Sequence, residues 1–362
     1  MINLKVELGR KTYPIFIGDN MLANLGEMMQ LYGFATRAVV ITDANVAHLY
    51  GDAITASLSG RIELLEVISL PAGEKSKSFP TLERIMTDML RKECDRAVAV
   101  LAFGGGVVGD IAGFAASVYK RGVPYIQIPT TLLAQVDSSV GGKTGINHAL
   151  GKNLVGTFYQ PKMVWSDLAL LESLPPREIR CGLGEIIKYG IIKDADLFAV
   201  VEAHLERILE LDPGLLQEIV KRCCEIKASV VAADERESGL RMILNFGHTV
   251  GHAIEAALGY KSISHGEAVL AGMLAESKMA LCSALLDQTD FDRIAALLSR
   301  FGLLRKLGRL SRSEILRFMK SDKKAMAGKL RFVLPRTIGK VDILDEVEET
   351  LIEHGLDVLN LR

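Results

Sequence analysis

The chain has 362 residues, with 43 lysines and arginines against 44 aspartates and glutamates, and 49% of its residues are hydrophobic. This composition is that of a folded globular protein and excludes a disordered or collagen-like chain. A formal net charge of −1 argues against a general polyanion binder, because nucleic-acid-binding proteins usually carry a basic excess. No apolar run reaches the ~20 residues that cross a bilayer. We therefore expect neither nucleic acid nor a membrane as a partner.

The cysteines are scattered and odd in number, without the C-x-x-C spacing of a zinc ribbon. They predict no disulfide framework and are typical of a reducing compartment. Residues 1–10 alternate apolar and charged side chains, unlike a secretory signal. We expect a cytoplasmic protein.

The first half of the chain alternates strand and helix patterns. Two β-type runs at 2–8 and 13–18 predict an opening hairpin. Predicted strands follow at 38–42, 64–70, 97–103 and 125–128, and predicted helices lie at 21–32, 79–92 and 111–118. This alternation predicts a mainly parallel sheet with helices on both faces, whose ligands bind at the carboxyl ends of the strands.

After Pro175 and Pro176 the pattern becomes helical. Helical spacing covers 179–211, 213–234, 242–258, 266–286 and 291–301. Two successive prolines disfavour a helix across them. We therefore predict an α/β domain at 1–174 and a helical domain at 175–362, with the functional site in the cleft between them.

A glycine-rich turn, Gly104 to Asp110, follows one predicted strand and matches G-x-G-x-x-G before a helix. Such glycines let backbone N–H groups approach a pyrophosphate at a helix N-terminus. The acidic partner expected ~20 residues downstream is missing, because the next acid is Asp137. A strand-to-helix turn without a ligand remains the alternative. Asp43, at the end of an earlier predicted strand, is a candidate for holding a ribose.

The segment between Lys120 and Asn153 combines glycines with lysines. Gly141 to Thr144 is similar to the end of a phosphate loop, but Val136 stands where that motif needs its first glycine, which argues against a P-loop NTPase. Lys143 and Lys152, each directly after a glycine, suit a phosphorylated small molecule. Solvated surface lysines are the alternative.

A third group of residues has metal-ligand chemistry. Glu185 and Lys188 share one face of an otherwise apolar predicted helix. Asn245, His248 and His252 form a polar stripe on another predicted helix, and His265 opens the next. Thr249 occupies the position of the catalytic glutamate in H-E-x-x-H, which argues against a zinc protease. Histidines together with Glu185 predict a metal site with an open position, whereas satisfied core histidines are the alternative.

Together these motifs resemble the 3-dehydroquinate synthase family, within the sugar phosphate cyclases. The resemblance runs through 71–77, 104–110, 129–144, 150–153, 184–189, 234–237, 244–257 and 322–324. It implies an α/β nucleotide-binding domain, an all-α metal-binding domain and a homodimer. It also implies NAD and a divalent metal, normally zinc, with cobalt as an alternative. Ala72 departs from the aspartate that relatives often have before Gly-Glu-Lys.

The resemblance assigns roles by matching position. The implied metal ligands are Glu185, His248 and His265. The implied NAD contacts are Asp43, Asn45, Gly73, Glu74, Lys75, Lys77, Gly106, Val107, Val108, Gly109, Asp110, Thr130, Thr131, Lys143, Lys152, Leu170, Leu171, Glu172 and Ser173. The implied substrate contacts are Lys152, Asn153, Asn245, His252 and Lys324 (or Lys323) at a phosphate, Lys227 and Arg241 at a carboxylate, and Arg121 reaching over from the partner subunit. The implied catalytic residues are Asp137, Lys143, Lys188, Glu235 and His252.

The implied reaction converts 3-deoxy-D-arabino-heptulosonate 7-phosphate to 3-dehydroquinate and phosphate. NAD transiently oxidises the C5 hydroxyl, which acidifies the C6 proton for β-elimination of phosphate. The hydride then returns, the ring opens and an intramolecular aldol closes the carbocycle, without net redox change.

Three alternatives remain. One is a polyol dehydrogenase similar to glycerol dehydrogenase, and another is a sibling cyclase whose substrate lacks a carboxylate. Lys227 and Arg241 argue against both, because such substrates carry no carboxylate. The third alternative is a nucleotide-binding regulatory module, which would not need the three metal ligands.

Overall fold

The computed structural model describes residues 1–237, 239–259, 262–325 and 330–362, without the side chains of 305–306 and 321–325. The chain forms two compact units. Unit 1 comprises Met1–Leu174 and Pro213–Arg236, and unit 2 comprises Pro175–Asp212 and Glu237–Arg362. Helix α7 (Pro213–Ala233) belongs to unit 1 because it packs on the first two strands. The sequence predicts one domain over 175–362, whereas in the structure residues 213–236 of that range belong to unit 1.

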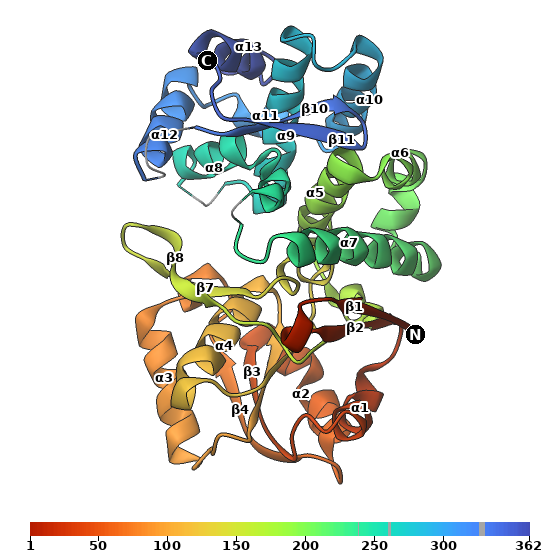
Figure 1. The fold of residues 1–362 in the computed structure, drawn as a ribbon, viewed down its shortest axis with the longest axis vertical. Helices are drawn as coiled ribbons and strands as arrows, with labels where there is room; N and C mark the ends of the chain where they lie inside the picture. The colour runs from red at the N-terminus through yellow and green to blue at the C-terminus, as the bar shows by residue number, and fades with distance from the viewer. Residues whose placement is uncertain (238, 260–261, 326–329) are drawn as a thin grey trace. The chain divides into compact units, whose positions relative to one another are not determined.

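Unit 1 is built around a seven-stranded sheet of order β1-β2-β9-β6-β5-β3-β4 (Figure 1). The strands are β1 (Ile2–Val6), β2 (Tyr13–Gly18), β3 (Arg37–Asp43), β4 (Glu63–Leu70), β5 (Ala99–Gly104), β6 (Tyr125–Pro129) and β9 (Met163–Asp167). β1 pairs antiparallel with β2, and the other neighbours are parallel. The predicted strands are confirmed in this sheet. The sequence analysis did not predict strand β9, helix α2 (Ala44–Leu58), or a separate hairpin of β7 (Lys143–His148) and β8 (Gly151–Phe158).

The two faces of the sheet bury alternate residues of each central strand. Val39 and Ile41 of β3 belong to one apolar cluster, while Ala38 and Val40 belong to the other. Helices α3 (Phe79–Arg91) and α4 (Gly106–Val118) contribute to the first cluster, and α1 (Leu25–Leu31) and α2 (Ala44–Leu58) contribute to the second. Burial on both faces explains why the strands read as continuous apolar runs.

The strand order reverses next to β3. This strand pairs with β4 on one side and with β5 on the other, so the connection from β3 to β4 runs one way and the connection from β4 to β5 runs back across β3. Asp43 ends β3 and Gly104 ends β5, and both lie at the carboxyl edge of the sheet. Open α/β sheets bind ligands at such a switch point.

Unit 2 is mainly helical and surrounds one central helix. Its helices are α5 (Pro176–Lys193), α6 (Ala195–Leu209), α8 (His248–Ala257), α9 (His265–Cys282), α10 (Gln288–Ser299), α11 (Leu304–Leu307), α12 (Arg312–Ala325) and α13 (Glu349–Asp357). Helix α9 is buried along most of its length, and α5, α8, α10 and α13 pack on it. None of the helices in the described ranges is both long and apolar enough to cross a bilayer.

Two details of unit 2 differ from the sequence prediction. The helix predicted at 179–211 is split into α5 and α6, because Asp194 Oδ1 accepts a hydrogen bond from the Leu197 N–H at 3.0 Å and caps α6. A hairpin of β10 (Phe332–Thr337) and β11 (Lys340–Leu344) also occurs in this mainly helical half.

Helices α5 and α9 make direct backbone contact. A Cβ on Gly184 would lie 2.8 Å from the Gly266 carbonyl oxygen, and a Cβ on Gly266 would overlap the Cys181 carbonyl. The Gly266 N–H points at Cys181 Sγ, 3.3 Å away. The small residues thus allow the two helices to approach more closely than side chains would permit.

We predict that Gly266→Ala lowers the free energy of unfolding by ~1–3 kcal/mol, because the added methyl group overpacks this contact. Urea unfolding followed by circular dichroism measures the change. Gly51→Ala in α2 is the control: its Cβ meets no described atom within 4 Å, and alanine favours a helix. Equal stability of the Gly266 variant and the wild type would contradict the contact.

Candidate active site

The glycine turn lies at the carboxyl edge of unit 1. Helix α4 begins at Gly106, and its N-cap residue, Gly105, provides no side-chain cap. A Cβ on Gly106 would lie 3.0 Å from Ser138 Oγ, and a Cβ on Gly109 would lie 2.8 Å from Gln127 Oε1. The glycines therefore serve tight packing, and they also leave the first N–H groups of the helix without a side-chain cap, which suits a phosphate.

Lys77 connects two of the predicted cofactor segments. Its buried Nζ donates to Asp110 Oδ2 at 2.6 Å and to the Asn153 side-chain oxygen. Burial raises the pKa of Asp110, and the positive charge of Lys77 opposes that rise. The turn after β4, the start of α4 and strand β8 therefore meet at one ammonium group.

Asn147 reinforces this meeting point. Its Nδ2 donates to Glu74 Oε1 at 2.8 Å, and its Oδ1 accepts from the Asn153 N–H at 2.9 Å. The Asn147 N–H also donates to the Lys77 carbonyl at 2.9 Å. Sequence reasoning did not single out Asn147, because an asparagine outside any recognised motif carries no distinctive signal.

Two predicted catalytic carboxylates of unit 1 are paired with lysines. Lys227 Nζ lies 2.8 Å from Asp137 Oδ1 and donates to the Asp137 carbonyl, also at 2.8 Å. Glu235 accepts from Lys11 Nζ at 3.0 Å and from Gln160 Nε2 at 3.1 Å. The hydrogen bond from Lys11 lowers the pKa of Glu235, so this carboxylate is ionised at neutral pH.

The remaining predicted residues of unit 1 follow strand ends or turns. Asp43 Oδ1 caps α2 by accepting from the Asn45 N–H at 2.9 Å. Thr130 and Thr131 follow β6, the turn at 168–173 follows β9, and Lys143 begins β7. Arg121 comes after the end of α4 and before β6, at the amino edge of the sheet. The structure thus does not bring Arg121 to the carboxyl-edge residues of its own chain.

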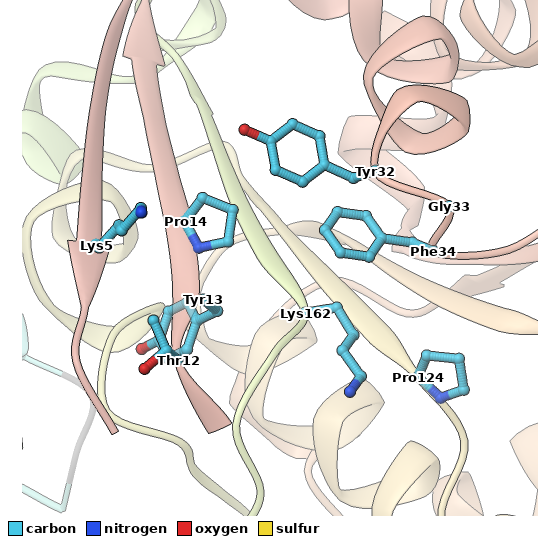
Figure 2. A pocket seen from close by; sticks show the side chains of 9 residues that line it. All are labelled: Lys5, Thr12, Tyr13, Pro14, Tyr32, Gly33, Phe34, Pro124 and Lys162. Atoms are coloured by element: carbon cyan, nitrogen blue, oxygen red, sulfur yellow. The ribbon is translucent and has the colours of Figure 1, made fainter. Parts of the chain in front are cut away.

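A cavity of about 510 Å³ also lies at the amino edge of the sheet (Figure 2). Its lining consists of Lys5, Thr12, Tyr13, Pro14, Tyr32, Gly33, Phe34, Pro124 and Lys162. None of these is a predicted site residue. The candidate site is therefore defined by side-chain clusters and not by this cavity.

Unit 2 gathers three side chains with metal-ligand chemistry. Glu185 comes from α5, His248 from α8 and His265 from α9, and their ligand atoms lie within 4.8 Å of one another. Glu185 Oε1 is 3.6 Å from His248 Nε2 and 3.7 Å from His265 Nε2. The other ring nitrogens have partners of their own. His248 Nδ1 lies 3.1 Å from the Phe246 carbonyl, and His265 Nδ1 lies 3.1 Å from Glu255 Oε2.

These residues fit a divalent cation. Glu185 is 1% exposed, and its Oε2 is paired with Lys188 Nζ. Among the described residues, no hydrogen-bond donor reaches its buried Oε1. Partners at both Nδ1 atoms orient the two Nε2 atoms toward this oxygen, as they do in metal sites. A buried carboxylate oxygen that faces two imidazole nitrogens is stabilised by a cation among the three.

The two histidines differ in the direction in which their pKa values shift. Burial, and then the charge of Lys188, hold the pKa of His248 well below its usual range, so this ring is neutral. Burial also lowers the pKa of His265, but the hydrogen bond that its ring donates to Glu255 and the charge of Glu185 more than offset this effect, and the net shift is upward. A metal must therefore displace a proton from His265 more often than from His248.

His252 lies beside the cluster and is exposed. Its ring centroid is 5.3 Å from that of His248 and 5.9 Å from that of His265. The ring nitrogens of His252 do not belong to the set of closely spaced ligand atoms that includes Glu185. His252 does form a second set of closely spaced ligand atoms with Glu255 and His265. Geometry thus separates His252 from the set that surrounds the Glu185 oxygen.

The predicted polar stripe of Asn245, His248 and His252 is wrong in one member. Asn245 ends a 3-10 turn, Leu240–Asn245, and Gly247 at φ 78° separates that turn from α8. The side-chain Nδ2 of Asn245 donates a hydrogen bond to Glu237 Oε1 at 3.2 Å. Arg241 in the same turn is buried. The side chains of Lys323 and Lys324 lie outside the described residues.

The fold is shared with solved synthases. The 2-epi-5-epi-valiolone synthase from Streptomyces hygroscopicus subsp. jinggangensis, with NAD+ and Zn2+ bound, is 30% identical with a TM-score of 0.87, covering 99% of each chain. A 2-deoxy-scyllo-inosose synthase complexed with carbaglucose-6-phosphate, NAD+ and Co2+ is 26% identical with a TM-score of 0.89, again covering 99% of each chain. An iron-containing alcohol dehydrogenase, at 16% identity and a TM-score of 0.65, covers 96% of this chain and 97% of its own and shares the fold alone.

Sequence comparison shows to which family of synthases the chain belongs. The profile of the 3-dehydroquinate synthase N-terminal part matches residues 67–181, and that of the C-terminal part matches 182–325. The 3-dehydroquinate synthase of Desulforamulus reducens is 48% identical over 96% of this chain and 98% of its own. That of Thermodesulfovibrio yellowstonii is 47% identical over 96% of this chain and 97% of its own. The chain belongs to the 3-dehydroquinate synthase family.

We predict that Lys77→Met lowers the free energy of unfolding by ~1–3 kcal/mol, because it leaves the Asp110 carboxylate without its cation. The double variant Lys77→Met/Asp110→Asn recovers part of that loss, because neither member of the pair is then charged. A double-mutant cycle by urea unfolding measures the coupling. Strictly additive effects of the two substitutions would contradict the pairing.

Proposed function

We propose that this chain converts 3-deoxy-D-arabino-heptulosonate 7-phosphate to 3-dehydroquinate and phosphate. Membership of the 3-dehydroquinate synthase family supports the reaction. The single structural observation that carries the proposal is the buried Glu185 Oε1 facing His248 Nε2 and His265 Nε2.

We propose Glu185, His248 and His265 as ligands of a zinc ion, with cobalt as an alternative. NAD is assigned to the carboxyl edge of unit 1. The reversal of strand order beside Asp43 and Gly104 supports this assignment, as do the NAD+ and metal ions in the two solved synthases. When bound, NAD takes up and returns a hydride, and the metal stabilises negative charge on substrate oxygen.

The chain's own residues bind and orient the substrate. Lys152, Asn153, Asn245, His252 and Lys324 are assigned to the phosphate, and Lys227 and Arg241 to the carboxylate. Each charge-assisted contact contributes ~1.5–3 kcal/mol. Asp137 holds the Lys227 ammonium group in place through two contacts. Fixed cations of this kind favour the anionic substrate without reorganisation during the reaction.

Protons are handled by groups beside the metal set. Exposed His252 is assigned to proton transfer or to orientation of the phosphate, and the departing phosphate serves as a base for its own elimination. Lys188 Nζ pairs with Glu185 Oε2, which keeps Oε1 directed toward the two histidines. Lys143, Asp137 and Glu235 complete the proposed catalytic group.

We also propose a cytoplasmic homodimer in which Arg121 serves the site of the partner subunit. The position of Arg121 at the amino edge of the sheet supports a role outside its own carboxyl-edge cluster. The free cysteines, four of which are buried, agree with a reducing compartment.

We predict that the purified protein, given the heptulosonate phosphate, Zn2+ and catalytic NAD, releases phosphate without accumulation of NADH. The hydride returns to the substrate, so the cofactor is recycled. Phosphate is measured colorimetrically and NADH by absorbance in the same sample. Stoichiometric formation of NADH would indicate a polyol dehydrogenase instead.

We predict that His248→Ala loses bound metal, whereas His252→Ala retains it and loses turnover. The first substitution removes a ligand, and the second removes an exposed group beside the ligand set. Elemental analysis of dialysed protein measures the metal. Equal metal loss in both variants would refute the ligand assignment.

A further inference from the structure

A buried carboxyl group outside the set of Glu185, His248 and His265 binds the start of helix α8. Glu276 of α9 is fully buried. Its Oε2 accepts a hydrogen bond from the Gly247 N–H at 2.7 Å, and its Oε1 accepts from the Val250 N–H at 3.4 Å. Glu276 therefore binds the start of α8 from another helix, and no motif in the sequence indicated this role.

Helix α8 cannot cap its own N-terminus. Its N-cap residue is Gly247, which has no side chain to accept from the first N–H groups. A side chain at Gly247 would be strained at φ 78°, and its Cβ would lie 2.7 Å from the Val269 carbonyl oxygen. The Glu276 side chain supplies the acceptors that the N-cap position lacks.

His248 is the first residue of this helix, so its ring position depends on the first turn. The carbonyl that faces His248 Nδ1 belongs to Phe246, one residue before the capped Gly247. Glu276 and His265 share helix α9. The Glu276 side chain thus links α9, which carries His265, to the first turn of α8, which carries His248.

We propose that Glu276 is a positioning residue for the metal centre, which holds the first turn of α8 and thereby keeps His248 Nε2 facing Glu185 Oε1. This inference rests on the proposed metal role of Glu185, His248 and His265. Glu276 itself coordinates nothing in this proposal. Its effect on the metal passes through the backbone of Gly247 and Val250.

The test compares Glu276→Gln and Glu276→Leu with Met279→Ala, all on α9. Met279 is fully buried and packs against Gly355 of α13, away from the hydrogen bonds of Glu276. Met279→Ala therefore destabilises the same helix through a cavity and leaves the start of α8 intact. The metal-free proteins are titrated with Co2+ by visible absorption and with Zn2+ against a chromophoric chelator, and their melting temperatures are recorded.

We expect Glu276→Leu to weaken metal binding by ~10–100-fold, the usual effect of losing a group that orients a ligand. Glu276→Gln should fall between Leu and the wild type, because its amide oxygen still accepts one N–H. The Co2+ spectrum should change in both variants. Met279→Ala should melt at a lower temperature with unchanged metal affinity.

Wild-type affinity and spectrum in both Glu276 variants would overturn the positioning role, and so would an equal loss of affinity in Met279→Ala. If Glu276→Leu does not fold, the nearly isosteric Gln variant decides the matter. Failure of the wild type to bind one Co2+ per chain would instead refute the metal centre, and the positioning role with it.

Discussion

One carboxylate oxygen, Glu185 Oε1, sets the requirements for unit 2. It is buried, faces two imidazole nitrogens and has no hydrogen-bond donor among the described residues. Such an arrangement costs several kcal/mol unless a cation compensates it. It also requires α5, α8 and α9 to converge. Because Gly266 has no side chain, the backbone of α9 contacts the backbone of α5. The Glu276 side chain on α9 accepts a hydrogen bond from the start of α8.

Buried positive charge in this chain is paired with negative charge. Three buried lysines each lie against a carboxylate: Lys77 on Asp110, Lys188 on Glu185 and Lys227 on Asp137. Pairing is what makes a buried ammonium group tolerable. Lys77 is proposed as a cofactor contact, Lys188 as a catalytic residue and Lys227 as a substrate contact, and an acid holds each of the three ammonium groups in position.

Local sequence patterns predict the structure correctly where burial determines which residues are apolar. Central strands with both faces covered gave continuous apolar runs, and the helical second half showed its period directly. Errors arose where one residue changed the backbone. Gly247 removed Asn245 from the predicted stripe, and Asp194 divided one predicted helix into two. Helix α7 follows unit 2 residues in the chain but packs with unit 1, which periodicity does not reveal.

The sequence by itself determined the donor types, the helices that carry them and the family to which the chain belongs. Spacing left His248, His252 and His265 as candidate ligands, because it relates only residues within one helix. Tertiary structure decided which nitrogens face Glu185 Oε1 and which histidine lies outside. It also brought in Asn147 and Glu276, whose partners lie on other elements. Contacts between elements depend on how closely backbones approach, and periodicity does not encode that distance.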